Sequence, residues 1–327
     1  MSRNLLHMQD IIPPISRELL KQELTEDKFL RYTNFGNRLV YVVTAHDAPN
    51  VMQELGRLRE EAFRSGGGGT GKSADIDEFD TMPDPYKQLV VWDPAEEEIV
   101  GGYRFIEGNR VKFSADGKPL LSTTEIFRFS DQFIQEYLPK TIELGRSFVQ
   151  PKYQSARRGV FSLDNLWDGL GGLVTINKSW MQYFFGKVTM YTSYNKEARD
   201  TLLYYVNHYH HDPEDLVIPI DPIQPVTPKA QLDGLFSGLD MEEAYKVANK
   251  RIRELGENIP PLFNSYIKLS PEMRSFGTCI NTHFGGVEET GILIKIDEIY
   301  PTKKERHIPE NIESVQVPPK PEKQASL

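Results

Sequence analysis

Several charged residues occur at short, fixed spacings, and their types are those that handle protons and small acids. Glu143 and Arg146 stand three apart in the run ELGRSFVQPKY. Asp77 and Asp80 stand three apart in DEFD, and Arg104 lies in GGYRFI. A positioned carboxylate can accept a proton from a reacting amine, and a guanidinium can bind a carboxylate through two parallel hydrogen bonds. The competing explanation is structural, because Glu143 in an apolar strand could form a buried ion pair with Arg104 or Arg146 and do no chemistry.

The spacing of Glu143 and Arg146 sets a condition on the strand that carries them. Residues 142–149 are rich in Ile, Leu, Phe and Val and are predicted to form a strand. Side chains three apart point to opposite faces of a flat strand, so both can reach one site only where the strand is bulged or twisted. Gly145 is the residue that we expect to permit this distortion.

The glycine-rich residues 66–73, GGGGTGKS, match the phosphate-loop pattern G-x-x-x-x-G-K-[ST]. In such loops a buried strand leads into the glycines and a helix follows, so that backbone N–H groups and the helix dipole converge on a phosphate. Here a charged helical segment, RLREEAFR, precedes the glycines and an acidic segment, SADIDEFD, follows them. We therefore favour a mobile loop that closes over a substrate, with a nucleotide-binding protein as the alternative.

The histidines and the cysteine do not predict a metal site. His208, His210 and His211 lie in NHYHHD, where histidines are favoured at a helix C-terminus for structural reasons alone. His210 and Asp215 also fit the H-x-x-x-x-D spacing of glycerolipid acyltransferases, but Pro213 interrupts that segment. Cys279 is the single cysteine, which excludes an intrachain disulfide and a multi-thiolate zinc site. Trp92, Trp167 and Trp180 are expected in the core.

Charge and hydropathy exclude some functional classes. The 327 residues include 38 Lys and Arg against 47 Asp and Glu, a net charge of −9 that argues against a general nucleic-acid binder. No run of about 18–20 apolar residues and no signal-peptide core is present, so we expect a cytoplasmic protein. The charge is uneven: residues 65–98 hold nine acids and two bases, whereas residues 150–187 hold five bases and two acids.

The hydrophobic periodicity predicts strands that alternate with helices along the chain, which indicates an α/β fold. The predicted strands are residues 38–45, 88–92, 99–106, 142–149, 186–192 and 291–300. The predicted helices are residues 15–24, 49–64, 163–178, 196–210 and 241–256, with a shorter helical or loop segment at 261–269.

The composition changes at Val217, where four prolines in VIPIDPIQPVTPK predict an extended crossing segment. This change divides the chain into four parts. They are an N-terminal helical arm (1–34), an α/β core (35–216), a C-terminal extension packed on that core (217–308) and a flexible tail (309–327).

Taken in order, these motifs resemble a known family. R-x-x-x-F at Arg59 and Phe63, then D-x-x-D, G-x-Y-R and E-x-x-R, are similar to the pattern of acyl-homoserine-lactone synthases. The fuller run LREEAFR, DEFD, GGYR and ELGRSFVQPKY resembles more closely the ornithine-lipid and glycine-lipid N-acyltransferases, often labelled hemolysin-like. The resemblance covers about residues 35–210, and FGTCINTHFGGVEETGILIKIDEIYP resembles the C-terminal part of that group.

The resemblance implies a GNAT-like acyltransferase fold with a central mixed, mainly antiparallel sheet flanked by helices, followed by the C-terminal extension. It also implies lipid biosynthesis by transfer of a long acyl chain, often 3-hydroxylated, from acyl carrier protein to the α-amine of an amino acid such as glycine or ornithine. Attack on a thioester needs a neutral amine, a base and donors for the oxyanion, with no covalent nucleophile and no cofactor.

The resemblance also implies roles for individual residues. Glu143 would be the base, directly or through water, and Arg146 and Arg104 would orient it or bind the amino acid's carboxylate. The remaining substrate-side residues are Arg59 and Phe63, which would line the amine side, and Asp77 and Asp80, which would fix the arginines.

The donor site departs from the pattern of acetyl-CoA enzymes of this fold, which carry Q/R-x-x-G-x-G/A after the central strand. Gln154 to Phe161 (QSARRGVF) lacks the second small residue, which favours a carrier protein over acyl-CoA as the donor. The expected donor-binding residues are Lys152, Arg157, Arg158 and Gly159. The competing interpretation of these bases is a solvated surface.

Besides the nucleotide-binding protein, the sequence leaves two alternatives to a carrier-dependent N-acyltransferase. The first is an acyl-homoserine-lactone synthase-like enzyme, although such synthases lack the extra residues after Val217. The second is a non-enzymatic lipid-binding module with structural arginines. Peripheral membrane contact is expected from a lipid-like product.

Overall fold

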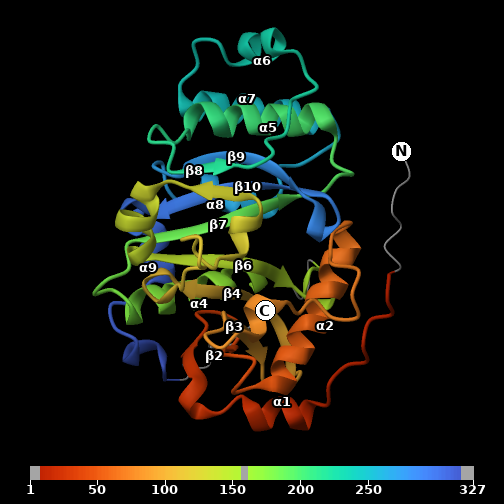
Figure 1. Ribbon diagram of the computed structural model, residues 1–327, viewed down its shortest axis with the longest axis vertical. Helices are drawn as coiled ribbons and strands as arrows, with labels where there is room; N and C mark the ends of the chain where they lie inside the picture. The colour runs from red at the N-terminus through yellow and green to blue at the C-terminus, as the bar shows by residue number, and fades with distance from the viewer. Residues whose placement is uncertain (1–7, 156–160, 318–327) are drawn as a thin grey trace, which may run out of the picture.

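In the computed structural model, which describes residues 8–155 and 161–317, a twisted eight-stranded sheet runs through the molecule (Figure 1). From one edge to the other its strands are β1 (Phe29–Tyr32), β2 (Leu39–Val43), β3 (Lys87–Asp93), β4 (Glu98–Glu107), β6 (Thr141–Val149), β7 (Tyr183–Met190), β10 (Val287–Lys295) and β9 (Arg274–Asn281). A small second sheet pairs β5 (Phe127–Phe129) with β8 (Val217–Pro219).

The strand directions confirm the expected mixed, mainly antiparallel sheet. Among the pairs that the structure describes, β6 with β7 is parallel and the others are antiparallel. The parallel pair is joined by α4 (Ser162–Ile176), as a crossover between parallel strands requires.

Helices cover both faces of the sheet because side chains alternate along its strands. Tyr41 and Val43 of β2 pack with α2 (Pro49–Gly66) in one apolar cluster, whereas Val40 packs with α4 in another. The second cluster also receives α5 (Lys196–Tyr209), α7 (Met241–Glu254) and α8 (Pro261–Ile267). The remaining helices are α1 (Arg17–Glu23) beside α2, α3 (Glu78–Thr81), α6 (Lys229–Phe236) beside α5 and α7, and α9 (Pro301–His307) beside α4.

The C-terminal extension is part of the main sheet. β10 pairs with β7 from Tyr183↔Lys295 to Met190↔Glu288, and β9 pairs with β10 (Figure 1). At the other end, β1 of the N-terminal arm pairs with β2. In the tail, Pro309 accepts a hydrogen bond from Thr175 at 2.8 Å, and residues 318–327 lie outside the described part. Within the described ranges, none of the helices has the length and apolar character needed to cross a bilayer.

Candidate active site

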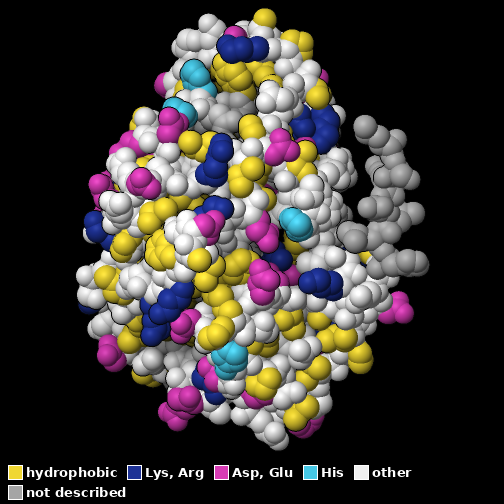
Figure 2. Space-filling model, in the orientation of Figure 1, with side chains coloured by type: hydrophobic (Ala, Val, Ile, Leu, Met, Phe, Trp, Pro, Cys, Tyr) yellow, Lys and Arg dark blue, Asp and Glu magenta, His cyan; other side chains and the backbone are white. Residues whose placement is uncertain are grey.

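Two cavities meet near the middle of the sheet. The apolar cavity has a volume of about 520 Å³ and lies between β6 and β7, extending toward residues 257–262. The polar cavity has a volume of about 260 Å³ and lies under the glycine-rich residues, with Asp77, Arg104 and His283 among its walls. Arg146, Lys187 and Phe284 line both cavities, which places the two cavities next to each other. Figure 2 shows basic, acidic and histidine side chains close together near the centre of one face, among hydrophobic side chains.

The apolar cavity exists because β6 and β7 separate. Their parallel pairing runs from Thr141↔Tyr183 to Leu144↔Gly186 and goes no further. Residues 145–149 of β6 and several residues of β7 beyond Gly186 line the opening instead. Backbone groups there are available to a ligand, because they lack a neighbouring strand on that side.

A bulge in β6 brings Arg146 to the point where the cavities meet. Gly145 is opposite Arg104 of β4 and Phe148 is opposite Gly102, so β6 has one extra residue between these pairs. The left-handed residue is Arg146, with φ 48°, and not Gly145. The expected distortion is therefore present but one residue later. A Cβ at Gly145 would lie 3.4 Å from Arg104 Nε, which is an ordinary contact distance, so Gly145 packs directly against this arginine.

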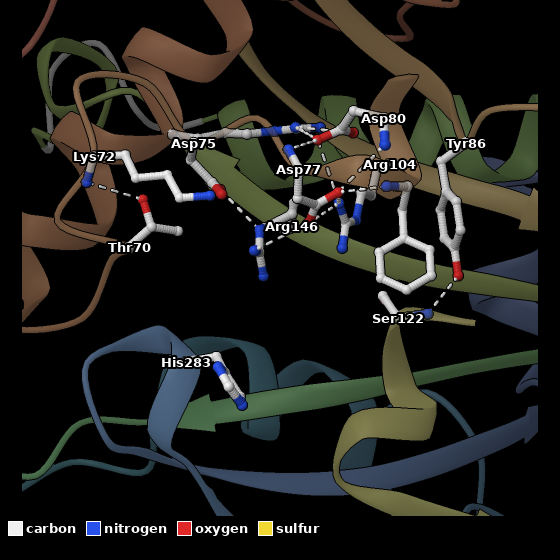
Figure 3. Close-up of polar contacts among 12 residues, drawn as sticks. Thr70, Lys72, Asp75, Asp77, Asp80, Tyr86, Arg104, Ser122, Arg146 and His283 are labelled. Atoms are coloured by element: carbon white, nitrogen blue, oxygen red, sulfur yellow. Dashed lines mark hydrogen bonds and ion pairs between the residues drawn. The ribbon is translucent and has the colours of Figure 1, made fainter. Parts of the chain in front are cut away.

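Buried aspartates hold the arginines in place. Arg104 Nη1 donates to both oxygens of Asp77 at 2.7 Å and lies 3.3 Å from Asp80 Oδ2. Asp80 also pairs with Arg59 at 3.4 Å, and Asp77 caps α3 through the N–H groups of Phe79 and Asp80. These contacts connect α2, α3 and β4 through one network of charges, and Figure 3 shows Arg104 beside Asp77 and Asp80.

Arg146 completes this network from β6. Its Nε lies 2.8 Å from Asp75 Oδ2, its Nη2 lies 3.5 Å from Asp77 Oδ2, and its guanidinium lies over the ring of Phe284 at 4.4 Å. Burial alone would raise the pKa of Asp77, but the charges of Arg104 and Arg146 outweigh it and lower the pKa to about 2. Asp77 is therefore a carboxylate that fixes arginines and is a poor proton acceptor.

Glu143 lies behind this network and lines neither cavity. Its side chain is buried and accepts a short hydrogen bond from the Tyr86 hydroxyl, which in turn accepts from the Ser122 N–H at 2.9 Å. The Tyr86 ring lies under the Arg104 guanidinium at 5.1 Å. Burial raises the pKa of Glu143, against the lowering effect of the Tyr86 hydrogen bond. No ion pair joins Glu143 to Arg104 or Arg146 in the described part of the chain.

The second half of the chain supplies the opposite wall. Lys187 of β7 pairs with Glu289 of β10 at 2.6 Å, and Glu289 also accepts from Asn281 Nδ2 at 2.8 Å. Burial would raise the pKa of Glu289, but Lys187 lowers it. His283 follows Asn281 and lies across the polar cavity from Arg146 (Figure 3).

The glycine-rich residues are held by a carboxylate. Glu60 of α2 is buried and accepts hydrogen bonds from Thr70 N (3.0 Å), Thr70 Oγ1 (2.7 Å) and Gly71 N (2.7 Å). Helix α2 ends at Gly66, the first of these residues, and no helix follows until α3 at Glu78. The loop thus lacks the strand-to-helix frame of a phosphate loop, and two of its N–H groups bind Glu60.

The residues predicted from the sequence lie in three places. Arg104, Arg146 and Asp77 line the polar cavity, and Phe63 lines the apolar cavity. Arg59, Asp80 and Glu143 are buried behind them. Lys152 lies away from both cavities and pairs with Glu98 at 2.6 Å and Glu96 at 3.1 Å. The predicted donor residues Arg157, Arg158 and Gly159 are outside the described residues.

Several members of the site were not predicted from the sequence. Tyr86 and Gln88 are buried beside the network, and Lys187, Glu289 and His283 form the far wall. His283 does lie in the C-terminal motif noted above, which was the available signal. Cys279 is buried, and burial raises the pKa of its thiol to about 12. In residues 8–155 and 161–317, no three His, Cys, Asp or Glu side chains are grouped as metal ligands.

Comparison with known proteins gives consistent similarities. Residues 58–163 match the acetyltransferase (GNAT) domain. The chain is 56% identical over 310 residues to a glycine N(alpha)-acyltransferase of Bacteroides thetaiotaomicron, covering 94% of this chain and 92% of that protein. It is also 56% identical over 304 residues to a glycine N(alpha)-acyltransferase of Phocaeicola vulgatus, covering 92% and 93%.

Two solved structures are more distant. FeeM, an N-acyl amino acid synthase from uncultured soil microbes, aligns with a TM-score of 0.39 and 9% identity, over 80% of this chain and 92% of that chain. MesI, a CoA-dependent acyl-homoserine lactone synthase, aligns with a TM-score of 0.33 and 12% identity, over 82% and 92%.

Proposed function

The chain belongs to the glycine N(alpha)-acyltransferase family and is a GNAT enzyme that transfers an acyl group to an amino acid, and we propose that its acceptor is glycine and its donor a long-chain acyl thioester. The observation that carries this proposal is the junction of the two cavities at Arg146. An acyl chain in the apolar cavity and a small amino acid in the polar cavity would meet there.

The polar cavity suits a small acceptor with a carboxylate. Arg146 is held at the junction and has an 11% exposed side chain, so its guanidinium can bind a carboxylate while Asp75 neutralises its other edge. Lys187 also lines both cavities, and its charge is paired with Glu289 at 2.6 Å. Arg104 is committed to Asp77 and Asp80, which supports a role in orienting Asp77 and Arg146.

The apolar cavity suits a long acyl chain on an amide-containing arm. The separated strands β6 and β7 offer backbone groups to amides, and the deeper walls include Leu144, Leu166 and Met190. We further propose that the transferred acyl chain carries a hydroxyl group at its third carbon. The hydroxyls of Tyr103, Tyr266 and Ser147 lie together at this cavity and could bind a hydroxyl that an unsubstituted chain lacks.

We propose an acyl carrier protein as the donor, with acyl-CoA less favoured. The support is the sequence after β6, which lacks the second small residue of the pyrophosphate-binding turn. In this proposal Arg157, Arg158 and Gly159 contact the carrier. Lys152 would have to leave Glu98 and Glu96 to join them, since their hydrogen bonds raise its pKa and keep it paired.

The reaction needs a neutral amine in line with the thioester carbonyl and no covalent enzyme intermediate. Arg146 would fix the glycine carboxylate, and the acyl cavity would fix the carbonyl carbon. Attack forms the C–N bond, the C–S bond then breaks, and the carrier leaves as the thiol. Glu143 has no direct access to the amine, because neither Glu143 nor Tyr86, which donates a hydrogen bond to it, lines either cavity.

The test is a transfer assay with purified protein. We would incubate 3-hydroxypalmitoyl carrier protein, palmitoyl carrier protein and 3-hydroxypalmitoyl-CoA separately with a panel that includes glycine, ornithine and homoserine lactone precursors, and identify products by mass spectrometry. The expected product is N-(3-hydroxypalmitoyl)glycine from the carrier thioester. Exclusive product from another amine would refute glycine as the acceptor, and preference for the CoA thioester would refute the carrier as the donor.

The nucleotide alternative has its own measurement. Titration of the protein with magnesium ATP and GTP should give no saturable heat, because Glu60 occupies the N–H groups of Thr70 and Gly71. Micromolar binding that is lost in Lys72→Ala would favour that alternative.

A further inference from the structure

His283 is placed in the polar cavity by a rigid turn between β9 and β10. Its backbone N–H donates to Asn281 Oδ1 at 3.1 Å, and Asn281 in turn donates to Glu289 at 2.8 Å. Gly285 and Gly286 follow with φ of 75° and 71°. A Cβ on Gly285 would come within 3.1 Å of Gly68 Cα, so this turn packs closely on the glycine-rich loop. The backbone that carries the His283 imidazole is therefore held in place by these contacts.

Phe284, the residue after His283, packs against side chains on the other side of the cavity. Phe284 is buried, with its ring 4.4 Å from the Arg146 guanidinium and 5.0 Å from the Phe63 ring. His283 itself is exposed to the cavity on the side opposite Arg146 (Figure 3). A glycine whose carboxylate binds Arg146 can therefore orient its amine toward the side of the cavity that holds His283.

Other proton acceptors at the two cavities are already engaged or are weaker bases. Asp77 is bound by Arg104 and has a pKa of about 2, and Glu289 is bound by Lys187. Glu78 and Glu125 also line the polar cavity and are exposed, as His283 is, but a free carboxylate is a weaker base than an imidazole. The imidazole of His283 has no hydrogen bond or ion pair to any residue in the described ranges. Imidazole is also the side chain whose basicity best matches proton transfer near neutral pH.

We propose that His283 is the general base that accepts the proton of the glycine ammonium, an inference that rests on the proposed function. The imidazole takes one proton and leaves the nitrogen lone pair free. That pair forms the C–N bond to the thioester carbonyl, whose π electrons move to oxygen. When the carbonyl reforms, the C–S bond breaks, and the second proton of the nitrogen goes to the leaving thiolate. His283 releases its proton to water, so the products are N-acylglycine, the carrier thiol and one proton.

The decisive variants are His283→Asn and His283→Ala, with His46→Asn as the matched control on an exposed histidine outside both cavities. For glycine, kcat should fall about 100-fold or more in both variants, with the KM of the acyl donor changed less than threefold. Added imidazole should restore part of the activity of His283→Ala in proportion to its concentration. His46→Asn should match the parent protein.

A second acceptor separates the base from a structural role. The amine of aminooxyacetate is uncharged at neutral pH, so its acylation needs no proton removal before attack. The deficit of His283→Asn should shrink to tenfold or less with this acceptor. An equal deficit with both acceptors, or His283→Asn activity within threefold of the parent, would overturn the proposal. If the parent protein itself fails to acylate glycine, the proposed function has failed instead.

Discussion

At the scale of single residues, Arg146 has an unfavourable backbone conformation and a stabilising ion pair. A left-handed conformation costs a non-glycine residue roughly 1–2 kcal/mol. The conformation turns the side chain toward Asp75, which is fully buried and whose only ion pair within 4 Å in the described part is with Arg146. Loss of one partner of a buried ion pair costs about 3–5 kcal/mol, so the ion pair outweighs the backbone strain.

Arg146→Met should therefore both inactivate and destabilise the enzyme. We expect the free energy of unfolding to fall by about 3 kcal/mol or more, because the Asp75 carboxylate stays buried without its guanidinium. Urea denaturation of Arg146→Met and of Asp75→Asn/Arg146→Met measures this. The double variant should regain most of the stability and remain inactive. Equal stabilities of the two variants would show that Asp75 is not the source of the loss.

Asp77 gives a pH-dependent prediction. Its pKa is lowered from 3.8 to about 2 in the folded protein, so its stabilising contribution is complete above about pH 4 and is lost as the pH falls through about 2. Asp77→Asn should thus be less stable than the parent at pH 7 by on the order of 1–2 kcal/mol, and this difference should vanish near pH 2. Urea unfolding between pH 7 and pH 2 measures it. Asp84→Asn, an exposed aspartate, should show no such difference.

At the scale of secondary structure, local pattern predicted the elements that carry strong periodicity. The helix at 49–64 and the strands at 88–92, 99–106 and 142–149 match α2, β3, β4 and β6 within a few residues. β1 and β9 were missed because they are short or polar at many positions, and their strand conformation comes from pairing with β2 and β10. The bulge was foreseen from the spacing of Glu143 and Arg146, but its position at Arg146 depends on the distant Asp75.

The glycine-rich loop gives a prediction at this scale. Glu60→Gln keeps the shape of the side chain but removes a charge and one acceptor oxygen, so the N–H groups of Thr70 and Gly71 should lose protection. Hydrogen exchange of residues 66–73 should accelerate at least tenfold, and the KM for glycine should rise because Thr70 and Lys72 line the polar cavity.

The control for this loop is Glu61→Gln, a partly exposed neighbour that pairs with Arg57. Its exchange rates and KM should equal those of the parent. Unchanged exchange in Glu60→Gln would mean that packing of Gly68 against Gly285, and not the carboxylate, holds the loop.

At the scale of the whole molecule, the site joins two halves of the chain that the composition separates. Arg104 and Arg146 precede Val217, whereas His283 and Glu289 follow it. The order of strands in the sheet brings them together, since β10 lies beside β7. A single sequence contains no local signal for this pairing, which explains why the acidic and basic motifs were found but the far wall was not.

Many of the acidic residues behind the net charge of −9 form ion pairs within the protein. Asp75, Asp77 and Asp80 hold the site arginines, and Glu96 and Glu98 hold Lys152. The acidic stretch 65–98 therefore organises the cavity walls and the edge of the sheet. Among the basic residues of 150–187 that the structure describes, Lys152 and Lys187 also form ion pairs with acidic residues of the protein.

This arrangement predicts that the chain cannot be divided at residue 217. Removal of 217–327 would expose β7 along its pairing with β10 and take away the strand that buries Phe185 and Val188. A fragment of residues 1–216 should lack a cooperative thermal transition, and co-expression with residues 217–327 should restore both the transition and acyl transfer. Calorimetry of the purified fragment is the measurement. A fragment 1–216 that melts cooperatively would show that β9 and β10 are an addition to a core stable by itself.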